Sequence, residues 1–435
     1  MKKVITYGTY DMLHVGHIRL LKRAKALGDY LIVGVTSDTF DRARGKINVK
    51  QSLQERMDAV KATGLADEVI VEEYEGQKID DIRRYDIDIF TVGSDWQGKF
   101  DYLKEYCEVC YLERTQGISS TELREEERKI RIGLLGNLMF EIHKFSKESK
   151  YVNGAEIIGW YDPTGCYSDS EIMQYRDFDT LLEDTDALYI ANDSLKCYKY
   201  IRKALEKKKH VLVESPITME CSKTKELFAL AKKNNCILME SIKTAYSLAF
   251  SRLILLIKSG MIGKVTSIDS TCTSLKKNEH DRRGSMQSWG PFGLLSIYSF
   301  LGTNYIKKEI YTKLDNTGHD IFTKVNFYYD GAVASMKVAD GIKSEGELII
   351  SGTDAYVYVP APWWKTDYFE IRYENHDDNK RYFYQLEGEG IRYMIVCFLK
   401  AIKTGKADFY ISKEITLGIT QIMEDFNNKN DVFVL

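Results

Sequence analysis

The stretch KVITYGTYDMLHVGH, residues 3–17, joins a short apolar run to two histidines and decides the fold of the N-terminal part of the chain. Residues 3–8 predict a strand, and a helix is expected over 16–27. His14 and His17, two of only seven histidines, stand where the strand would pass into the helix. The N-terminus of a helix attracts phosphate. The stretch therefore predicts a phosphate site at the end of the first strand.

Length and composition limit the number of domains and the kinds of partner that the chain can have. The chain has 435 residues, is 44% hydrophobic and carries a net charge of −3. We expect two or three domains, no nucleic-acid partner and no transmembrane segment. The scattered cysteines and the lack of a signal-peptide core favour a cytoplasmic, reducing location. Cys107 and Cys110 would point to opposite faces of a strand, so no metal site is predicted.

Residues 1–128 alternate between the patterns of strands and helices, which is typical of an α/β domain with a doubly wound parallel sheet. Strands are expected over 3–8, 30–37, 67–71, 88–93 and 108–113, and helices over 16–27, 51–62, 78–84 and 119–127. Ligands bind at the carboxyl ends of the strands in such sheets. His14, residues 94–98 and residues 114–121 all follow strands, so we expect them to converge on one crevice.

The residue types at these strand ends suit phosphoryl or nucleotidyl transfer. Two imidazoles beside a helix N-terminus can donate hydrogen bonds to an oxygen that gains charge during the reaction. Arg114 begins RTQGISST, which offers a guanidinium, hydroxyls and backbone amides. Arg44 and Lys46, in the loop RARGK, are placed to close over a polyphosphate, whereas Arg42 is expected to be a solvated surface charge. No pair of residues suited to hydrolysis through a covalent intermediate stands out.

Four ordered segments carry a family resemblance: GTYDMLHVGH, RAKALGDYLIVGVTSDTF, GSDWQGKFDYLK and RTQGISST. Over residues 1–126 the chain resembles the glycerol-3-phosphate cytidylyltransferases, whose superfamily shares H-x-G-H after the first strand. The resemblance implies transfer of CMP from CTP to a small polyol phosphate, giving a CDP-glycerol-type product and pyrophosphate for teichoic acid, capsule or a similar surface polymer. It also implies Mg²⁺ carried on the CTP phosphates.

The resemblance implies roles for individual residues. Four would be catalytic: His14, His17, Lys46 and Arg114. The nucleotide would contact Gly8, Thr9, Tyr10, Asp11, Gly16, Arg44, Ser94, Asp95, Trp96, Thr115, Gly117, Ile118, Ser119, Ser120 and Thr121. The acceptor would contact Arg56 and Lys99, although a surface ion pair on a helix is an equal alternative for Arg56.

Two departures from the family pattern concern the acceptor pocket. Ser94 and Gln97 replace two acidic residues, and the RARGK loop differs from the lysine-rich family version. The cytidylyl reaction is expected to survive both changes. Glycerol 3-phosphate remains the favoured acceptor, and another small polyol phosphate such as glycerol 2-phosphate is the alternative.

The charged stretch at 120–129 predicts a domain boundary, followed by a second alternating region. We expect a cytidylyltransferase domain over 1–128, a dinucleotide-binding-like Rossmann domain over 129–245, and an α+β domain with a mainly antiparallel sheet over 246–435. Residues 129–425 resemble the glucose–fructose oxidoreductase and inositol dehydrogenase family, on HVLVESPITM, SRLILLIKSGMIGKVTSI and GPFGLLSIYSF. The resemblance implies NAD(P) bound near Gly136 and Asp162.

Several functional positions of that family are changed. The glycine-rich loop reads GNLMFE, so Leu138 and Glu141 replace small residues where a pyrophosphate would approach. Ser215 replaces the lysine of the E-K-P motif, and Ser296 and Phe300 replace an aspartate and a histidine. Hydride transfer to or from a carbonyl needs a proton donor or acceptor, and none stands at these positions unless Tyr298 substitutes.

We therefore interpret the second half as catalytically degenerate, with NAD(P) binding doubtful. Its expected roles are dimerisation into a homodimer, binding of a sugar or polyol, or docking of a polymer-synthesis partner. The alternative is a bifunctional enzyme whose second half is an NAD(P)-dependent reductase that supplies the polyol phosphate. A third hypothesis, a non-catalytic nucleotide sensor, is disfavoured by the intact His14, Gly16, His17 and Arg114.

Overall fold

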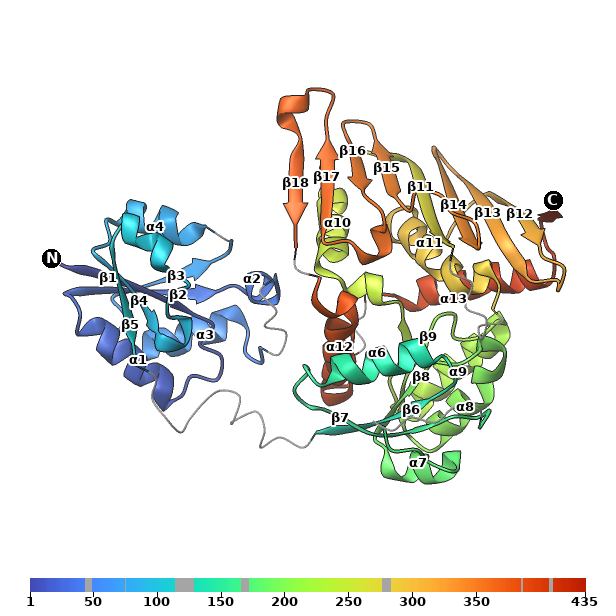
Figure 1. Cartoon of the computed structure of the whole chain (residues 1–435), viewed down its shortest axis with the longest axis horizontal. Helices are drawn as coiled ribbons and strands as arrows, with labels where there is room; N and C mark the ends of the chain where they lie inside the picture. The colour runs from blue at the N-terminus through green and yellow to red at the C-terminus, as the bar shows by residue number, and fades with distance from the viewer. Residues whose placement is uncertain are drawn as a thin grey trace. The chain divides into compact units, whose positions relative to one another are not determined.

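The computed structural model describes residues 1–43, 49–74, 76–113, 129–165, 172–275, 283–384, 386–406 and 410–435, without the side chains of 42, 43 and 387. Contacts divide the chain into two compact units, unit 1 over Met1–Arg128 and unit 2 over Lys129–Leu435 (Figure 1). Each unit is described by itself below.

Unit 1 is built on a five-stranded sheet in the order β3-β2-β1-β4-β5, and every neighbouring pair is parallel. Its strands are β1 (Lys3–Gly8), β2 (Tyr30–Thr36), β3 (Glu68–Glu72), β4 (Ile89–Gly93) and β5 (Glu108–Leu112). Its helices are α1 (Val15–Lys25), α2 (Asp38–Ala43), α3 (Leu53–Ala62) and α4 (Gln77–Tyr85), with short 3₁₀ turns η1 (Ser94–Trp96) and η2 (Asp101–Glu105). Figure 1 shows α4 on one face of the sheet and α1 and α3 on the other.

Successive residues of β1 point to opposite faces and feed two cores. Val4 packs with Leu21 of α1 and Val60 of α3, whereas Ile5 packs with Ile82 of α4 and with Phe90. Both faces of the sheet are therefore covered by helices, as a parallel sheet requires. The chain order reverses between β1 and β4, so the carboxyl ends of these two strands flank the crevice in which such sheets bind ligands.

Unit 2 begins with a second parallel sheet in the order β10-β9-β8-β6-β7. Its strands are β6 (Ile130–Leu135), β7 (Ala155–Tyr161), β8 (Ala187–Ile190), β9 (His210–Glu214) and β10 (Leu238–Ser241). The helices α6 (Met139–Ser149), α7 (Phe178–Asp184), α8 (Ser194–Glu206) and α9 (Cys221–Lys233) connect them. Side chains from β8, β9, α8 and α9 share one core, and Phe145 of α6 stacks on Tyr189 at 3.9 Å.

A nine-stranded mixed sheet follows, in the order β18-β17-β16-β15-β11-β14-β13-β12-β19. Its strands are β11 (Val265–Ser274), β12 (Lys307–Leu314), β13 (Asp320–Tyr329), β14 (Ala332–Asp340), β15 (Leu348–Gly352), β16 (Tyr356–Val359), β17 (Tyr368–Arg372), β18 (Lys380–Phe383) and β19 (Val432–Val434). All neighbours are antiparallel except β11 with β14 and β12 with β19.

The remaining helices of unit 2 are α10 (Leu248–Lys258), α11 (Ser285–Leu301), α12 (Ile391–Thr404) and α13 (Lys413–Asn427), with the 3₁₀ turns η3 (Lys243–Tyr246), η4 (Trp363–Lys365), η5 (His376–Asp378) and η6 (Glu387–Gly390). Helix α11 packs on β11, β13 and β14, α12 contacts α6, and α13 contacts α9. The later helices therefore tie the nine-stranded sheet to the Rossmann-like part of the same unit.

The predicted fold class is confirmed: two parallel α/β sheets and a mainly antiparallel sheet occur in the expected order. The sequence does not predict α2, α7, α10, α11, α12 or the strands β12, β17, β18 and β19. The expected helix at 119–127 lies outside the described residues, and the division at residue 245 stays a prediction. Within the described residues, no helix has both the length and the apolarity needed to cross a membrane.

Candidate active site

His14 is the N-cap of α1. Its backbone is extended, with φ −128° and ψ 174°, and its ring Nδ1 accepts the Gly16 N–H at 3.0 Å. Because Nδ1 is an acceptor, the proton of the neutral ring lies on Nε2. The cap therefore orients the imidazole and places its Nε2–H beside a helix N-terminus.

The second imidazole lies directly against the first. The rings of His14 and His17 stack with centroids 3.9 Å apart, and Tyr10 meets His17 edge-on at 5.5 Å. Tyr10 and Met12 both have φ near +50° (52° and 51°), a left-handed conformation that costs about 1 kcal/mol or more for residues other than glycine. The turn from β1 into α1 is therefore strained, and the two histidines follow it at the N-cap and in the first turn of α1.

Asp11 holds the segment that enters α3. Its carboxylate is 2% exposed, and Oδ1 accepts the N–H groups of Lys50 and Gln51 at 3.1 and 3.0 Å. The Gln51 side chain in turn accepts the Met12 N–H at 2.6 Å. These bonds fasten the segment at Lys50 and Gln51 to the histidine turn, so Asp11 acts as a positioning residue.

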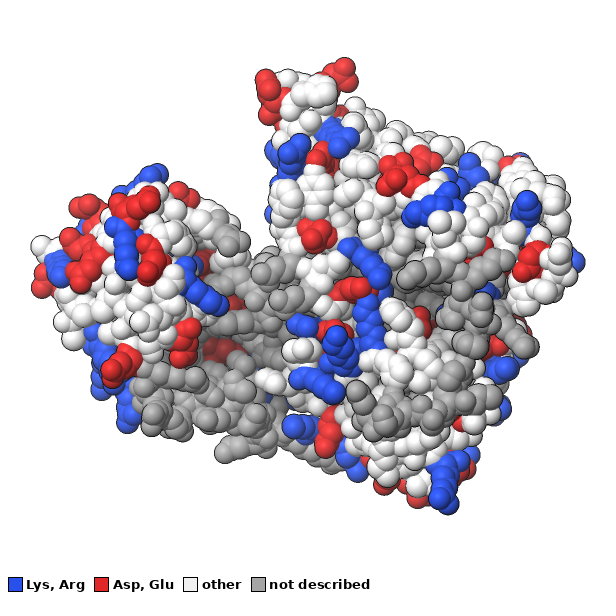
Figure 2. All heavy atoms as spheres, viewed as in Figure 1, with Lys and Arg blue, Asp and Glu red and all other residues white. Residues whose placement is uncertain are grey.

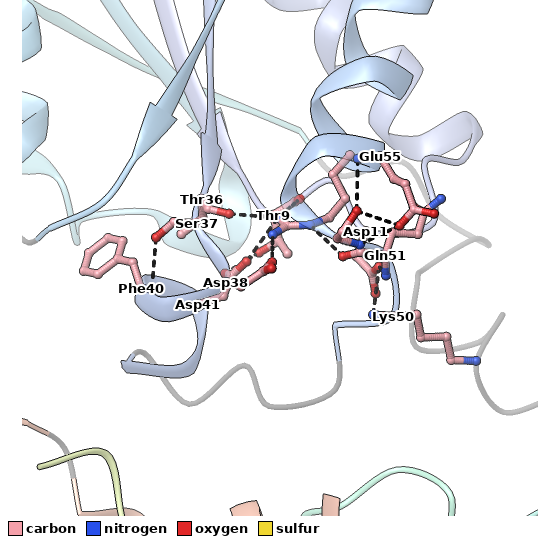
Figure 3. A network of polar contacts seen from close by, with 12 residues as sticks. Thr9, Asp11, Thr36, Ser37, Asp38, Phe40, Asp41, Lys50, Gln51 and Glu55 are labelled. Carbon is pink, nitrogen blue, oxygen red and sulfur yellow. Dashed lines mark hydrogen bonds and ion pairs between the residues drawn. The ribbon is translucent and has the colours of Figure 1, made fainter. Parts of the chain in front are cut away.

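Arg56 does not form a surface ion pair within its own helix. The side chain is fully buried, and Nη1 donates to the carbonyls of Thr9 and Thr36 at 2.7 and 2.8 Å. The guanidinium also pairs with Asp38 and Asp41 of α2, and Asp41 accepts the Thr9 hydroxyl at 2.7 Å. Figure 3 shows these groups joined into one network from the ends of β1 and β2. Arg56 thus fixes the carboxyl ends of β1 and β2 through hydrogen bonds to their carbonyl groups.

The end of β4 supplies the other side of the crevice. Ser94 and Asp95 open η1, and Trp96 packs on Phe100 with centroids 5.7 Å apart. The Lys99 ammonium lies 5.0 Å from the centroid of the Trp96 ring. Ser94 to Lys99 therefore form one compact turn at the carboxyl edge of the sheet.

A small cavity of about 40 Å³ opens between Gly8 at the end of β1 and Trp96 after β4. Lys78 of α4 lines it; this side chain is 8% exposed, pairs with Glu72 and lies 4.7 Å from the Tyr7 ring centroid. Lys78 is not among the site residues predicted from the sequence. Its one local signal is its place beside Gln77 and Asp81 on the buried polar face of an otherwise solvated helix.

The structure thus brings Gly8, Thr9, His14 and Gly16 to the end of β1, with Ser94, Asp95 and Trp96 after the neighbouring strand. The remaining predicted site residues lie outside the described residues: Arg44, Lys46, Arg114, Thr115, Gly117, Ile118, Ser119, Ser120 and Thr121. The part that is described offers directed N–H donors at a helix N-terminus, which is the chemistry that binds phosphate oxygens.

Unit 2 contains a large cleft of about 1060 Å³, lined in part by Glu141, Glu214, Ser215, Trp289 and Lys243. Burial and then the Glu141 carboxylate raise the pKa of Glu214. A pyrophosphate at the start of α6 would therefore approach the half-buried Glu141 carboxylate and, beside it, Glu214. The Glu141 charge opposes a dinucleotide phosphate at this point of the cleft.

The two residues predicted for dinucleotide binding have internal roles. Gly136, with φ +134°, packs so closely that a Cβ would lie 1.8 Å from the Ala191 carbonyl oxygen. Asp162 is 5% exposed and accepts both the N–H and the hydroxyl of Thr164, at 2.8 and 2.7 Å. The Leu138 amide donates to the Ala191 carbonyl at 3.2 Å. The described residues of this loop therefore form a strand-to-helix turn with little provision for a pyrophosphate.

The positions of the missing proton donors are occupied by packing residues. Ser296 is fully buried and donates to the Gly293 carbonyl at 2.8 Å, and Phe300 packs on Phe250. Tyr298 is 3% exposed and is absent from the lining of the cleft. Its burial raises the pKa of the phenol well above its ordinary value. Tyr298 is therefore not placed to serve as the substitute proton donor.

Ser215, which stands where the family has lysine, donates to Glu240 at 2.6 Å. Burial raises the pKa of Glu240 to about 7. Because the folded state holds this proton more tightly than the unfolded state, stability falls as pH rises from about 4.5 to 7. We expect Glu240→Gln to raise the free energy of unfolding of unit 2 by about 2–3 kcal/mol at pH 8 and to change it little at pH 4.5.

Urea unfolding followed at both pH values measures this difference. Exposed Glu156 on β7 provides the matched control, since Glu156→Gln removes a carboxylate from the surface. Equal effects of Glu240→Gln at pH 4.5 and pH 8 would show that Glu240 is not protonated in the folded protein.

Comparison with known proteins gives a consistent assignment for unit 1. Residues 5–126 match the family model described as cytidylyltransferase-like. Over 126 residues the chain is 53% identical to a glycerol-3-phosphate cytidylyltransferase of Bacillus spizizenii and 49% identical to one of Staphylococcus aureus. These matches cover 29% of this chain and 97% and 95% of the relatives.

Residues 141–242 of unit 2 match the model described as oxidoreductase family, NAD-binding Rossmann fold. Among solved structures, a 3-ketoreductase from Actinomadura kijaniata in complex with NADP and TDP-benzene has a TM-score of 0.62 at 16% identity, covering 71% of this chain and 100% of that one. A UDP-N-acetylglucosamine 3-dehydrogenase from Acidithiobacillus ferrooxidans has a TM-score of 0.60 at 13% identity, covering 70% and 98%. At these identities the likeness shows the fold alone.

The two halves of the chain therefore carry different kinds of information about function. Unit 2 shares the oxidoreductase fold, whereas unit 1 matches whole relatives of one named activity at about half identity. Residues 141–242 match an oxidoreductase family model, and through residues 1–126 the chain belongs to the glycerol-3-phosphate cytidylyltransferase family.

Proposed function

We propose that unit 1 transfers CMP from CTP to glycerol 3-phosphate, releasing pyrophosphate and CDP-glycerol. The observation that carries the proposal is the capped His14 ring, stacked on His17 at 3.9 Å at the carboxyl edge of the parallel sheet. Membership of the cytidylyltransferase family supports it independently.

In the proposed reaction a phosphate oxygen of the acceptor attacks the α-phosphorus of CTP. A bond forms between these atoms while the bond from the α-phosphorus to the β-phosphate oxygen breaks, and pyrophosphate leaves. The Nε2–H of His14, together with His17, stabilises the charge that gathers on the α-phosphate oxygens. Lys46 and Arg114 are proposed to hold the triphosphate.

Among the described residues, no group of three or more His, Cys, Asp or Glu side chains is placed to hold a metal ion. From the family resemblance, Mg²⁺ is proposed to arrive with CTP, where it would neutralise the phosphates.

For unit 2 we propose that the reductase chemistry of its fold family has been lost. Glu141 and Glu214 disfavour the pyrophosphate of a dinucleotide, and Ser215, Ser296 and Phe300 replace the proton-transferring residues. The rival hypothesis of a bifunctional reductase requires saturable NADPH or NADH binding, which a fluorescence titration would detect. We expect no saturable binding at micromolar dinucleotide.

The acceptor is tested by incubating the full chain with CTP, Mg²⁺ and a panel of acceptors while pyrophosphate release is followed. The panel holds glycerol 3-phosphate, glycerol 2-phosphate, a longer polyol phosphate and unphosphorylated glycerol. We expect turnover with glycerol 3-phosphate at least tenfold above glycerol, because the attacking atom is a phosphate oxygen. Replacing CTP with ATP should lower the rate, and mass spectrometry should identify CDP-glycerol.

A lack of pyrophosphate release with every acceptor would overturn the cytidylyltransferase proposal for this chain. Faster turnover with another polyol phosphate would support the cytidylyltransferase proposal but identify a different acceptor. Ser94 and Gln97, which replace two acidic residues of the family pattern, leave this outcome open.

A further inference from the structure

Four segments of unit 2 that are distant in sequence bring charged side chains together. Lys144 of α6, Lys243 of η3 and Lys365 of η4 all pair with the carboxylate of Glu389 in η6. The Lys365 ammonium lies 3.1 Å from Oε1, and the other two contact Oε2. Three cations around one anion leave a local excess of two positive charges.

The three lysines line the 1060 Å³ cleft, whereas Glu389 is not among the lining residues. Their side chains are 18%, 17% and 35% exposed, in the order Lys144, Lys243 and Lys365. An ammonium group carries three N–H donors, so one bond to Glu389 leaves donors for a ligand. Figure 2 shows Lys and Arg side chains gathered along the middle of unit 2.

The pKa values of the cluster reflect the same charge imbalance. Burial raises the pKa of Glu389, but hydrogen bonds from Lys144 and Lys243 outweigh it and lower the pKa to about 2. Burial lowers the pKa of Lys144, and the charges of Lys243 and Lys365 lower it further. Glu389 is thus fixed as an anion, while the lysines repel one another.

The backbone of Glu389 adopts a strained conformation that positions its carboxylate. Glu389 has φ +50°, a left-handed conformation unusual for a residue with a side chain. The next residue, Gly390, has φ +89°, and a Cβ there would lie 2.2 Å from the Lys243 carbonyl oxygen. Only glycine permits this approach, which holds η6 against η3 and sets the carboxylate among the lysines.

The rest of the cleft suits a polar ligand larger than inorganic phosphate. Trp289 and Trp364 meet with centroids 5.2 Å apart, and Trp289 donates to Asp340 at 2.8 Å. Asp315, Asp340 and Ser288 offer acceptors for hydroxyl groups. A cavity of this volume accommodates a molecule of nucleotide size.

We propose that Lys144, Lys243 and Lys365, gathered by Glu389, form an anion site in the cleft of unit 2 that binds a phosphorylated polyol, free or as its nucleoside diphosphate ester. The lysines hold the phosphate, and the carboxylates and the tryptophan pair contact the polyol and any base. The three ammonium groups can each donate a charge-assisted hydrogen bond to a phosphate oxygen at one side of the cleft. The choice of the polyol as ligand rests on the function proposed for unit 1; the anion site itself does not.

Equilibrium dialysis of the full chain, with labelled glycerol 3-phosphate and no CTP, tests the proposal. We expect two molecules bound per wild-type chain, one in each unit. Lys243→Gln/Lys365→Gln should weaken the unit 2 site by about tenfold or more, because each lost charge removes a charge-assisted hydrogen bond. Lys147→Gln/Lys150→Gln, at exposed positions near the C-terminal end of α6, also removes two positive charges and is the matched control that should retain both sites.

Further arms separate the sources of the phosphate. CDP-glycerol that displaces glycerol 3-phosphate from unit 2 would assign the nucleoside diphosphate ester, and its failure to compete would assign the free polyol phosphate. Binding of unphosphorylated glycerol as tight as that of glycerol 3-phosphate would overturn the anion site. Competition by NADPH at the unit 2 site would overturn the choice of a polyol.

An unchanged dissociation constant at the second site in the double variant would also overturn the proposal. Lys365→Gln alone, at the most exposed of the three positions, gives a second test if the double variant unfolds. Pyrophosphate release measured on the same preparations keeps the two proposals separate, since failure of catalysis in unit 1 does not remove a lysine-dependent site in unit 2.

Discussion

Replacing His14 with asparagine is expected to lower the rate of cytidylyl transfer by about 10²–10³-fold while leaving the stability of unit 1 close to that of the wild type. Asparagine is a favourable N-cap, so its side chain can still accept the Gly16 N–H that Nδ1 accepts now. The shorter amide cannot place a donor where the Nε2–H of the imidazole lies. The variant therefore separates the capping role of His14 from its proposed role toward the phosphate.

The comparison variant is His14→Ala, which loses both roles. It should show the same fall in rate and, in addition, a loss of about 1 kcal/mol in the free energy of unfolding of unit 1. Pyrophosphate release gives the rates, and urea unfolding gives the stabilities. An asparagine variant with the wild-type rate would show that the imidazole acts on the helix and not on the nucleotide.

The histidine site could be predicted because its signal is local. Strand, turn, N-cap and helix start all lie within residues 3–17, and the parallel sheet dictates that β1 and β4 end at one edge. The stacking of His14 on His17 could not be predicted in the same way. Residues three apart at a helix start are neighbours, but the pattern does not fix the ring orientations that bring the centroids to 3.9 Å.

Arg56 shows where local patterns fail. Its buried network depends on Asp38 and Asp41 in α2, a helix of six residues that is too short for its periodicity to be recognised. A charged residue on a predicted helix is normally solvated, so a surface ion pair is predicted as an equal alternative to acceptor contact, and neither prediction includes a buried network. Arg56 is buried because α3 packs against the ends of β1 and β2. This tertiary contact leaves no pattern in the local sequence.

The lysine cluster of unit 2 has no local signal at all. Lys144, Lys243, Lys365 and Glu389 lie on four separate elements, and a family resemblance directs attention to the loop at Gly136 and to Ser215 instead. The replacement of the family's functional residues can be read from the sequence. The clustering of the three lysines in the same cleft can be seen only in the folded chain.

Arg56→Met is expected to destabilise unit 1 by about 3–5 kcal/mol, because it leaves Asp41 buried without its cation and removes donors from the carbonyls of Thr9 and Thr36. The main effect should fall on the carboxyl ends of β1 and β2. Hydrogen exchange followed by mass spectrometry measures this local loss of stability separately in each unit. We expect faster exchange in peptides covering residues 3–10 and 30–41. Arg84→Met, at an exposed position on α4, is the matched control and should leave exchange unchanged.

Adding Asp41→Asn to Arg56→Met should restore part of the lost stability, because the amide removes the uncompensated charge while its oxygen can still accept the Thr9 hydroxyl. Asp38 needs no such rescue, since its side chain is 44% exposed and water can solvate it. If the double variant exchanged as fast as Arg56→Met alone, the cost would lie in the lost bonds to the carbonyls and not in the buried charge. If Arg56→Met exchanged like the wild type, the guanidinium would not brace the strand ends, and the fixed position of Thr9 beside His14 would need another cause.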